Sequence, residues 1–167
     1  MNLLKLISLV VAAALFVPAI AQTSATSKEP GSDSDSMNMQ ILRDKVKADK
    51  RLAVAQNMEL TDSEAKSFWP IYESYQADLA KINERMKQVI ITYADAYRAG
   101  AVPNETALKL LQESLATQDA EAQLARSYVP KLEKALPEWK VARYIQIETK
   151  IRALVRYELA AAIPLVQ

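Results

Sequence analysis

Apolar side chains recur three and four residues apart along most of the chain beyond residue 60. The series runs unbroken over residues 65–96 and ends before Gly100 and Pro103. This spacing places the side chains on one face of an α-helix, and its heptad form is typical of long helices packed side by side. We therefore predict a long helix that starts at Thr61 and packs through Ala65, Phe68, Tyr72, Tyr75, Leu79, Ile82, Met86, Val89, Tyr93 and Ala96.

Three further helices follow from the same kind of pattern. One is predicted from Asn104, a favourable N-cap residue, to about Leu136, and a fourth from about Pro137 to Ala162. A first helix, over about residues 37–57, has a weaker apolar face interrupted by Asp49. The predicted seam of the third helix comprises Leu108, Leu111, Leu115, Gln118, Ala122, Ala125, Val129, Leu132 and Leu136.

The predicted fold is all-α, with long antiparallel helices that form a helical hairpin or four-helix layer. Pro70 and Pro130 fall inside the two longest predicted helices. A proline inside a helix removes one backbone hydrogen bond and crowds the carbonyl four residues earlier, so each helix is expected to be kinked. Two kinked helices packed together predict a curved, cradle-like layer.

The beginning of the chain resembles a secretory signal peptide. Lys5 precedes an apolar run over residues 6–17, and Ala19-Ile20-Ala21 supplies small residues for cleavage after Ala21. The run is short for a membrane span, although a retained anchor is the alternative. Residues 22–36 are polar, with Pro30 and Gly31, and are predicted to be a disordered leader. The expected product is a periplasmic all-helical domain over residues 37–167, without stable membrane insertion.

Composition narrows the chemistry. The chain has no histidine, no cysteine and two glycines, which excludes the usual nucleophile–base pairs, soft metal sites and glycine-rich phosphate loops. Without Lys5, 20 basic residues balance 20 acidic ones, so no general attraction to nucleic acid is expected. Glu148 and Glu158 lie among arginines, where ion pairing is the expected role. We predict a protein without catalytic residues, metal or cofactor; hydrolysis by carboxylates alone is the remote alternative.

Exposed aromatic and basic side chains are then the candidates for binding polypeptides. Aromatic side chains beside arginine and lysine bind varied polypeptide surfaces. The simpler alternatives are that the aromatic residues fill space between helices and that the basic residues form a solvated helix face. The candidates are Arg43, Lys47, Lys50, Arg51, Trp69, Tyr97 and Tyr157.

The segment Leu60-Thr61-Asp62-Ser63-Glu64 has a meaning beyond the capping box that Thr61 and Glu64 predict. Together with the export signal and the polar leader, it resembles the LTxxQ motif of the Spy/CpxP family of periplasmic stress proteins, with Glu64 in place of glutamine. Leu136-Pro137 stands where that family carries a second, here divergent, copy. The stretch from Phe68 through Pro70 to Tyr75, and the last helix, resemble uncharacterised exported relatives of the family.

This resemblance implies a helical hairpin, often an antiparallel cradle-shaped dimer, and ATP-independent chaperoning on a concave surface. The leading hypothesis is a periplasmic chaperone or envelope-stress adaptor that binds unfolded polypeptides, as a homodimer and without a cofactor. The alternative is a regulatory module that binds one partner, such as the sensor domain of a membrane signalling protein.

Overall fold

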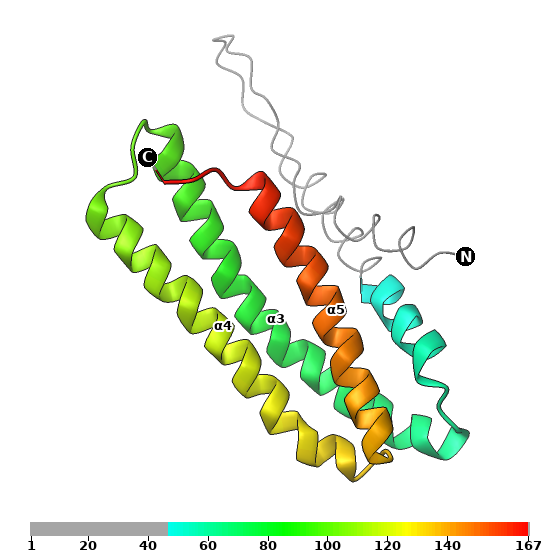
Figure 1. The fold of residues 1–167 in the computed structure, drawn as a ribbon. Helices are drawn as coiled ribbons and strands as arrows, with labels where there is room; N and C mark the ends of the chain where they lie inside the picture. The colour runs from blue at the N-terminus through cyan, green and yellow to red at the C-terminus, as the bar shows by residue number, and fades with distance from the viewer. Residues whose placement is uncertain (1–46, 167) are drawn as a thin grey trace, which may run out of the picture. The chain divides into compact units, whose positions relative to one another are not determined.

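The computed structural model describes residues 47–166, which contain four helices and no strand (Figure 1). These are residues 47–58, α3 (Asp62–Arg98), α4 (Asn104–Glu133) and α5 (Glu138–Ala162). The all-α prediction is confirmed. The described residues divide into two compact units, one of residues 47–59 and 147–159 and the other of residues 60–146 and 160–166. The predicted signal peptide, the leader and Arg43 lie outside the described residues.

The start of α3 is fixed by the predicted capping box. The Glu64 backbone N–H donates to Thr61 Oγ1 at 3.3 Å, and the Thr61 N–H donates to Glu64 Oε2 at 2.8 Å. Each group satisfies a donor that the first helical turn would otherwise leave without a partner. Asp62 and Glu64 also place negative charge at the positive end of the helix dipole.

Pro70 lies inside α3 and Pro130 lies inside α4, and both helices continue through them. Each proline is exposed, as are Lys66 and Arg126, the residues four positions earlier. The carbonyl groups that lose a helical hydrogen bond thus belong to exposed residues, where water is the available partner. The kinks and the cradle shape stay predictions.

The helices α3 and α4 form an antiparallel hairpin (Figure 1). Tyr75 near the start of α3 stacks edge to face on Tyr128 near the end of α4, with ring centroids 5.2 Å apart. Farther along α3, Arg85 Nε donates to Glu113 Oε1 at 2.8 Å. The turn between the helices contains Gly100, whose φ of +112° is a conformation that side-chain-bearing residues rarely adopt.

Aromatic rings form the core at the end of the hairpin where α5 begins. Tyr144 of α5 is fully buried, and its ring centroid lies 5.1 Å from that of Phe68 and 5.9 Å from that of Tyr75. The Tyr144 hydroxyl accepts a hydrogen bond from Gln76 Nε2 at 3.3 Å. Such edge-to-face pairs add to the free energy of burial. Buried around them are Tyr72, Leu79, Tyr128, Leu132, Leu136 and Val141.

The unit of residues 47–59 and 147–159 has a small core with a charge in it. Val54 and Met58, one turn apart, are fully buried. Glu148 is also fully buried, and its Oε2 accepts a hydrogen bond from Lys50 Nζ at 2.8 Å. Ion pairing, the role expected for Glu148, is thus observed. A buried carboxylate needs such a partner because burial without one is costly.

The predicted seam of α3 is confirmed, because all ten of its residues are buried or half-buried. The prediction of the α4 seam is wrong over the first half of the helix. Leu108, Leu111 and Leu115 are exposed, and α4 instead turns toward the core the face that includes Ala107, Leu110, Ser114, Thr117, Leu124 and Tyr128.

The bounds of α4 also differ slightly from the prediction. Asn104 is the first helical residue rather than the N-cap; that position belongs to Pro103, whose carbonyl accepts from the Ala107 N–H at 2.8 Å. The helix ends at Glu133, and a short turn leads to Pro137, the residue before α5.

Candidate functional site

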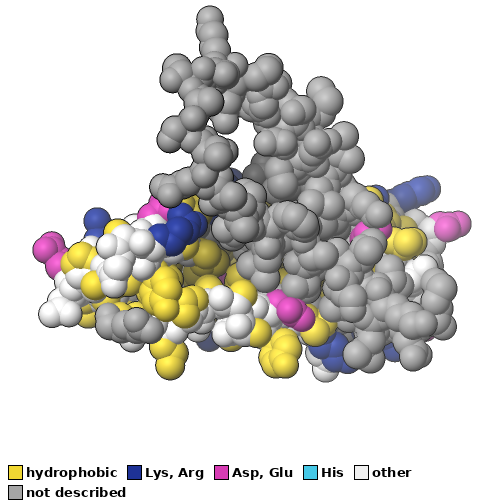
Figure 2. All heavy atoms as spheres, turned by 90° about the horizontal axis from the view of Figure 1, so that it is seen from above, with side chains coloured by type: hydrophobic (Ala, Val, Ile, Leu, Met, Phe, Trp, Pro, Cys, Tyr) yellow, Lys and Arg dark blue, Asp and Glu magenta, His cyan; other side chains and the backbone are white. Residues whose placement is uncertain are grey.

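Three leucines form an exposed apolar stripe on α4. Leu108, Leu111 and Leu115 follow one another at intervals of three and four residues. Their relative solvent-accessible surfaces are 57%, 55% and 52%. Figure 2 shows hydrophobic side chains standing out between charged ones on the described part of the face in view. We call these three residues the leucine stripe. An exposed apolar stripe of this kind is a candidate interaction surface.

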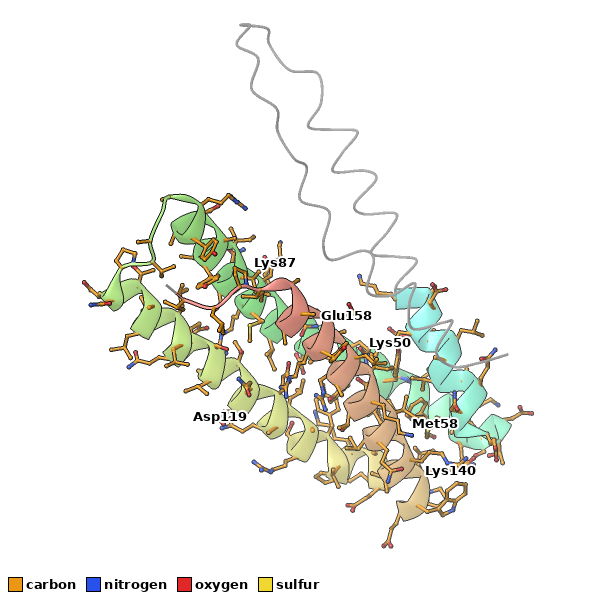
Figure 3. All side chains as sticks on the ribbon, turned by 45° about the horizontal axis from the view of Figure 1, so that its top comes forward. Lys50, Met58, Lys87, Asp119, Lys140 and Glu158 are labelled. Atoms are coloured by element: carbon orange, nitrogen blue, oxygen red, sulfur yellow. The ribbon has the colours of Figure 1, made fainter. Side chains whose placement is uncertain are left out.

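The stripe continues along the same face of α4 into smaller side chains. Gln118 and Ala122 are exposed, and Ala125 is half-buried. The whole series, from Leu108 to Ala125, keeps the 3–4 spacing of a helix-packing seam. Polar side chains follow it on one flank: Glu105, Gln112, Asp119 and Arg126, all exposed. Asp119 extends from α4 on the side away from α3 (Figure 3).

The predicted basic candidates belong to one unit. Lys47 and Arg51 are exposed on the helix of residues 47–58, whereas Lys50 is half-buried and paired with the buried carboxylate of Glu148. Tyr157, on the α5 segment of the same unit, is the most exposed aromatic residue among those described, at 71%. Lys50 therefore has a structural role, while the other three remain accessible.

The two aromatic candidates on α3 are not part of one site. Trp69 is half-buried and stacks edge to face on Phe68 and Tyr72, at centroid distances of 5.1 and 5.3 Å. Tyr97 is half-buried beside Tyr93, 6.0 Å away. Trp69 and Tyr97 are 28 positions apart along the helix, which corresponds to about 42 Å. Both residues are half-buried beside other aromatic rings, and their role in binding polypeptides stays a prediction.

The residues of the family-like motif are structural in this chain. Thr61 and Glu64 cap α3, Phe68 is buried in the aromatic core, and Leu136 is buried before Pro137. Glu64 also accepts a hydrogen bond from Lys140 Nζ at 2.7 Å, and Lys140 is itself buried in the first turn of α5 (Figure 3). The motif thus joins the start of α5 to the start of α3.

Three ionisable groups of the hairpin are shifted from their ordinary behaviour. The Lys140 ammonium, with the backbone N–H of Thr61, lowers the pKa of Glu64 below its ordinary 4.5. Lys81 and the Tyr128 hydroxyl lower the pKa of Asp78. Burial, together with the hydrogen bond from its hydroxyl to Asp78 Oδ2 at 2.7 Å, raises the pKa of Tyr128 to about 12. Each shift stabilises the charge state found at neutral pH and does not create a group poised for proton transfer.

Within residues 47–166, no group of three or more acidic side chains is arranged to hold a metal ion. No helix among those residues is long and apolar enough to cross a membrane. Comparison of the chain with protein-family models, with curated proteins and with solved structures found no match.

The 3–4 spacing of the leucine stripe predicts a place in the core, whereas the structure exposes it. The signal that separates the two faces of α4 is Tyr128. Its hydroxyl reaches Asp78 of α3, and counting back from it in steps of three and four leads to Leu124, Thr117 and Leu110 rather than to the leucine stripe.

Proposed function

We propose that this protein binds unfolded or partly folded polypeptides, as an exported chaperone or envelope-stress adaptor that acts without a cofactor. The observation that carries the proposal is the leucine stripe, which exposes three large apolar side chains on one helix of a well-packed hairpin. Unfolded chains expose apolar side chains that folded proteins bury, and contact with the stripe removes both surfaces from water.

The surroundings of the stripe support a surface of broad specificity. Glu105, Gln112, Asp119 and Arg126 offer acidic, neutral and basic groups along its flank, so varied polar groups of a client can be accommodated. The exposed Lys47, Arg51 and Tyr157 offer a second, more basic region for the same purpose. Resemblance to the Spy/CpxP family and the signal-like start of the chain support a periplasmic location and chaperone activity as parts of the proposal.

A homodimer is also part of the proposal, because an apolar stripe left in water favours self-association. The second candidate function is a regulatory module that binds one helix of one partner, such as a membrane sensor. The regular 3–4 spacing from Leu108 to Ala125 favours this alternative, since a seam of that kind accepts a helix better than an irregular chain.

Light scattering separates the two functions. The protein of residues 22–167 is added at equimolar ratio to several unrelated proteins that aggregate on heating or on dilution from denaturant. The proposed chaperone slows aggregation of most of them. Suppression of none, together with capture of a single periplasmic protein by crosslinking, contradicts the chaperone and supports the regulatory module.

A further inference from the structure

The seam on α4 is complementary to itself. Its first half has three large side chains, those of Leu108, Leu111 and Leu115. Its second half begins with Gln118 and ends with two small side chains, those of Ala122 and Ala125. A two-fold axis between Leu115 and Gln118 reverses the second copy of the helix. It then places Leu108 opposite the partner's Ala125 and Leu111 opposite the partner's Ala122. Large side chains meet small ones at both ends, as an isologous interface requires.

Charge selects this register. The same axis places Glu105 opposite the partner's Arg126, and Gln112 opposite the partner's Asp119, where an amide can donate to a carboxylate. Each contact occurs twice by symmetry. Moving the axis by half a heptad toward Leu111 instead places Glu105 opposite the partner's Asp119, and two like charges then face each other. Flanking charges of this kind set register and partner in helix pairs.

We propose that a second copy of this chain covers the leucine stripe when no client is bound, so that the antiparallel α4 pair is the resting form and the monomer is the form that binds. This inference rests on the proposed function, because it concerns how access to the stripe is regulated. A client and a second copy compete for the same three leucines. The fraction of chains able to bind then falls as the protein concentration rises.

Sedimentation velocity of residues 22–167 over a range of concentrations tests the interface. Glu105→Arg is expected to weaken the dimer at least about fivefold, and adding Arg126→Glu in the same chain is expected to restore it. Both sites are exposed, so the variants should fold as the unmodified protein does. A protein that is monomeric at all concentrations would overturn the proposal. Another protein, or another segment of this chain, would then be the partner of the seam. The proposal would also be overturned if Glu105→Arg weakened the dimer and the added Arg126→Glu did not restore it.

A reversible crosslink tests the regulation. The chain has no cysteine, so Leu108→Cys with Ala125→Cys introduces the only two thiols. Within one helix these positions are about 25 Å apart, too far for a disulfide, whereas the proposed register brings each beside its counterpart in the partner. The single variants are the matched controls and should not crosslink alone, although a mixture of the two should.

Because Leu108 belongs to the leucine stripe, the reference is the same double variant kept reduced. The oxidised dimer is expected to suppress client aggregation less than that reduced variant does, and reductant should return it to the level of the reduced variant. A crosslinked dimer that keeps its activity overturns the resting-form proposal. A different result would be that neither crosslinked nor reduced protein, nor the unmodified protein, protects any client. The proposed chaperone function would then fail, and the resting-form proposal would fail with it. The dimer interface would still stand if the charge reversal continued to control dimerisation.

Discussion

The ammonium group of Lys140 lies 2.7 Å from the carboxylate of Glu64, and the same carboxylate accepts a hydrogen bond from the backbone N–H of Thr61. One side chain thus caps α3 and holds the first turn of α5. Lys140 is buried, whereas the Glu64 side chain retains some exposure. The two members of the pair are therefore not equivalent.

Replacing Glu64 should cost more stability than replacing Lys140. Glu64→Gln keeps the capping interaction, since glutamine serves equally in a capping box, but withdraws a negative charge from a buried ammonium. Lys140→Met leaves a carboxylate that water can still reach. Urea unfolding followed by circular dichroism is expected to order the stabilities as unmodified, Lys140→Met, Glu64→Gln and, lowest, Glu64→Ala. A Glu64→Gln protein as stable as the unmodified one would show that the ion pair contributes nothing.

The same pair should make the hairpin sensitive to acid. A carboxyl group whose pKa is lowered on folding stabilises the native state above its ordinary pKa, and that contribution is lost as the pH falls through the lower native value. Glu64 and Asp78 both have lowered pKa values, from 4.5 and 3.8 respectively. Stability should therefore fall below about pH 4.5. In Glu64→Gln the fall should be shallower; an unchanged profile of unfolding free energy against pH would contradict the assignment.

The raised pKa of Tyr128 predicts that the protein loses stability at alkaline pH. Its hydroxyl donates to Asp78, and its pKa is raised to about 12, so the native state binds the phenolic proton more tightly than the unfolded chain does. The contribution is complete below the ordinary pKa of 10 and is lost as the pH rises through about 12. Tyr128→Phe should lower stability at pH 7 by about 1–3 kcal/mol and should flatten the alkaline part of the profile, measured by urea unfolding at several pH values.

Two tyrosines of α5 should differ sharply in their contribution. Tyr144 is fully buried among aromatic rings, and Tyr144→Ala should cost about 3–5 kcal/mol, enough to unfold a marginally stable protein. Tyr157 is exposed, and Tyr157→Ala should change stability by less than about 0.5 kcal/mol. Thermal unfolding of the two variants compares them directly. Equal losses would contradict the placement of the core.

The success of the α3 prediction and the failure on α4 have one physical cause. Along α3 the 3–4 series includes Phe68, Tyr72 and Tyr75, and no competing apolar face exists, so the pattern has a single solution. Along α4 two faces have the same spacing. One contains Leu108, Leu111 and Leu115, and the other contains Leu110, Thr117 and Leu124.

Hydropathy alone would bury the leucine stripe of α4, but burial also depends on how the side chains of α4 fit against those of α3. The buried face is set by Tyr128, whose ring contacts that of Tyr75 and whose hydroxyl donates to Asp78. Such a fit is a property of two helices together, and periodicity within one helix does not reveal it. The capping box of Thr61 and Glu64 was predictable because it depends only on local sequence. Its link to Lys140, 76 residues away, was not.

Binding of a permanently unfolded, fluorescently labelled polypeptide to residues 22–167 tests the central claim most directly. The decisive variant replaces all three residues of the leucine stripe with serine, and the matched control replaces two exposed apolar residues of the other unit, Leu52→Ser and Val155→Ser. We expect fluorescence anisotropy to show at least a tenfold weaker affinity for the stripe variant, about 1.4 kcal/mol, and a smaller change for the control. Unchanged affinity in the stripe variant, with its helical content intact, would contradict the account.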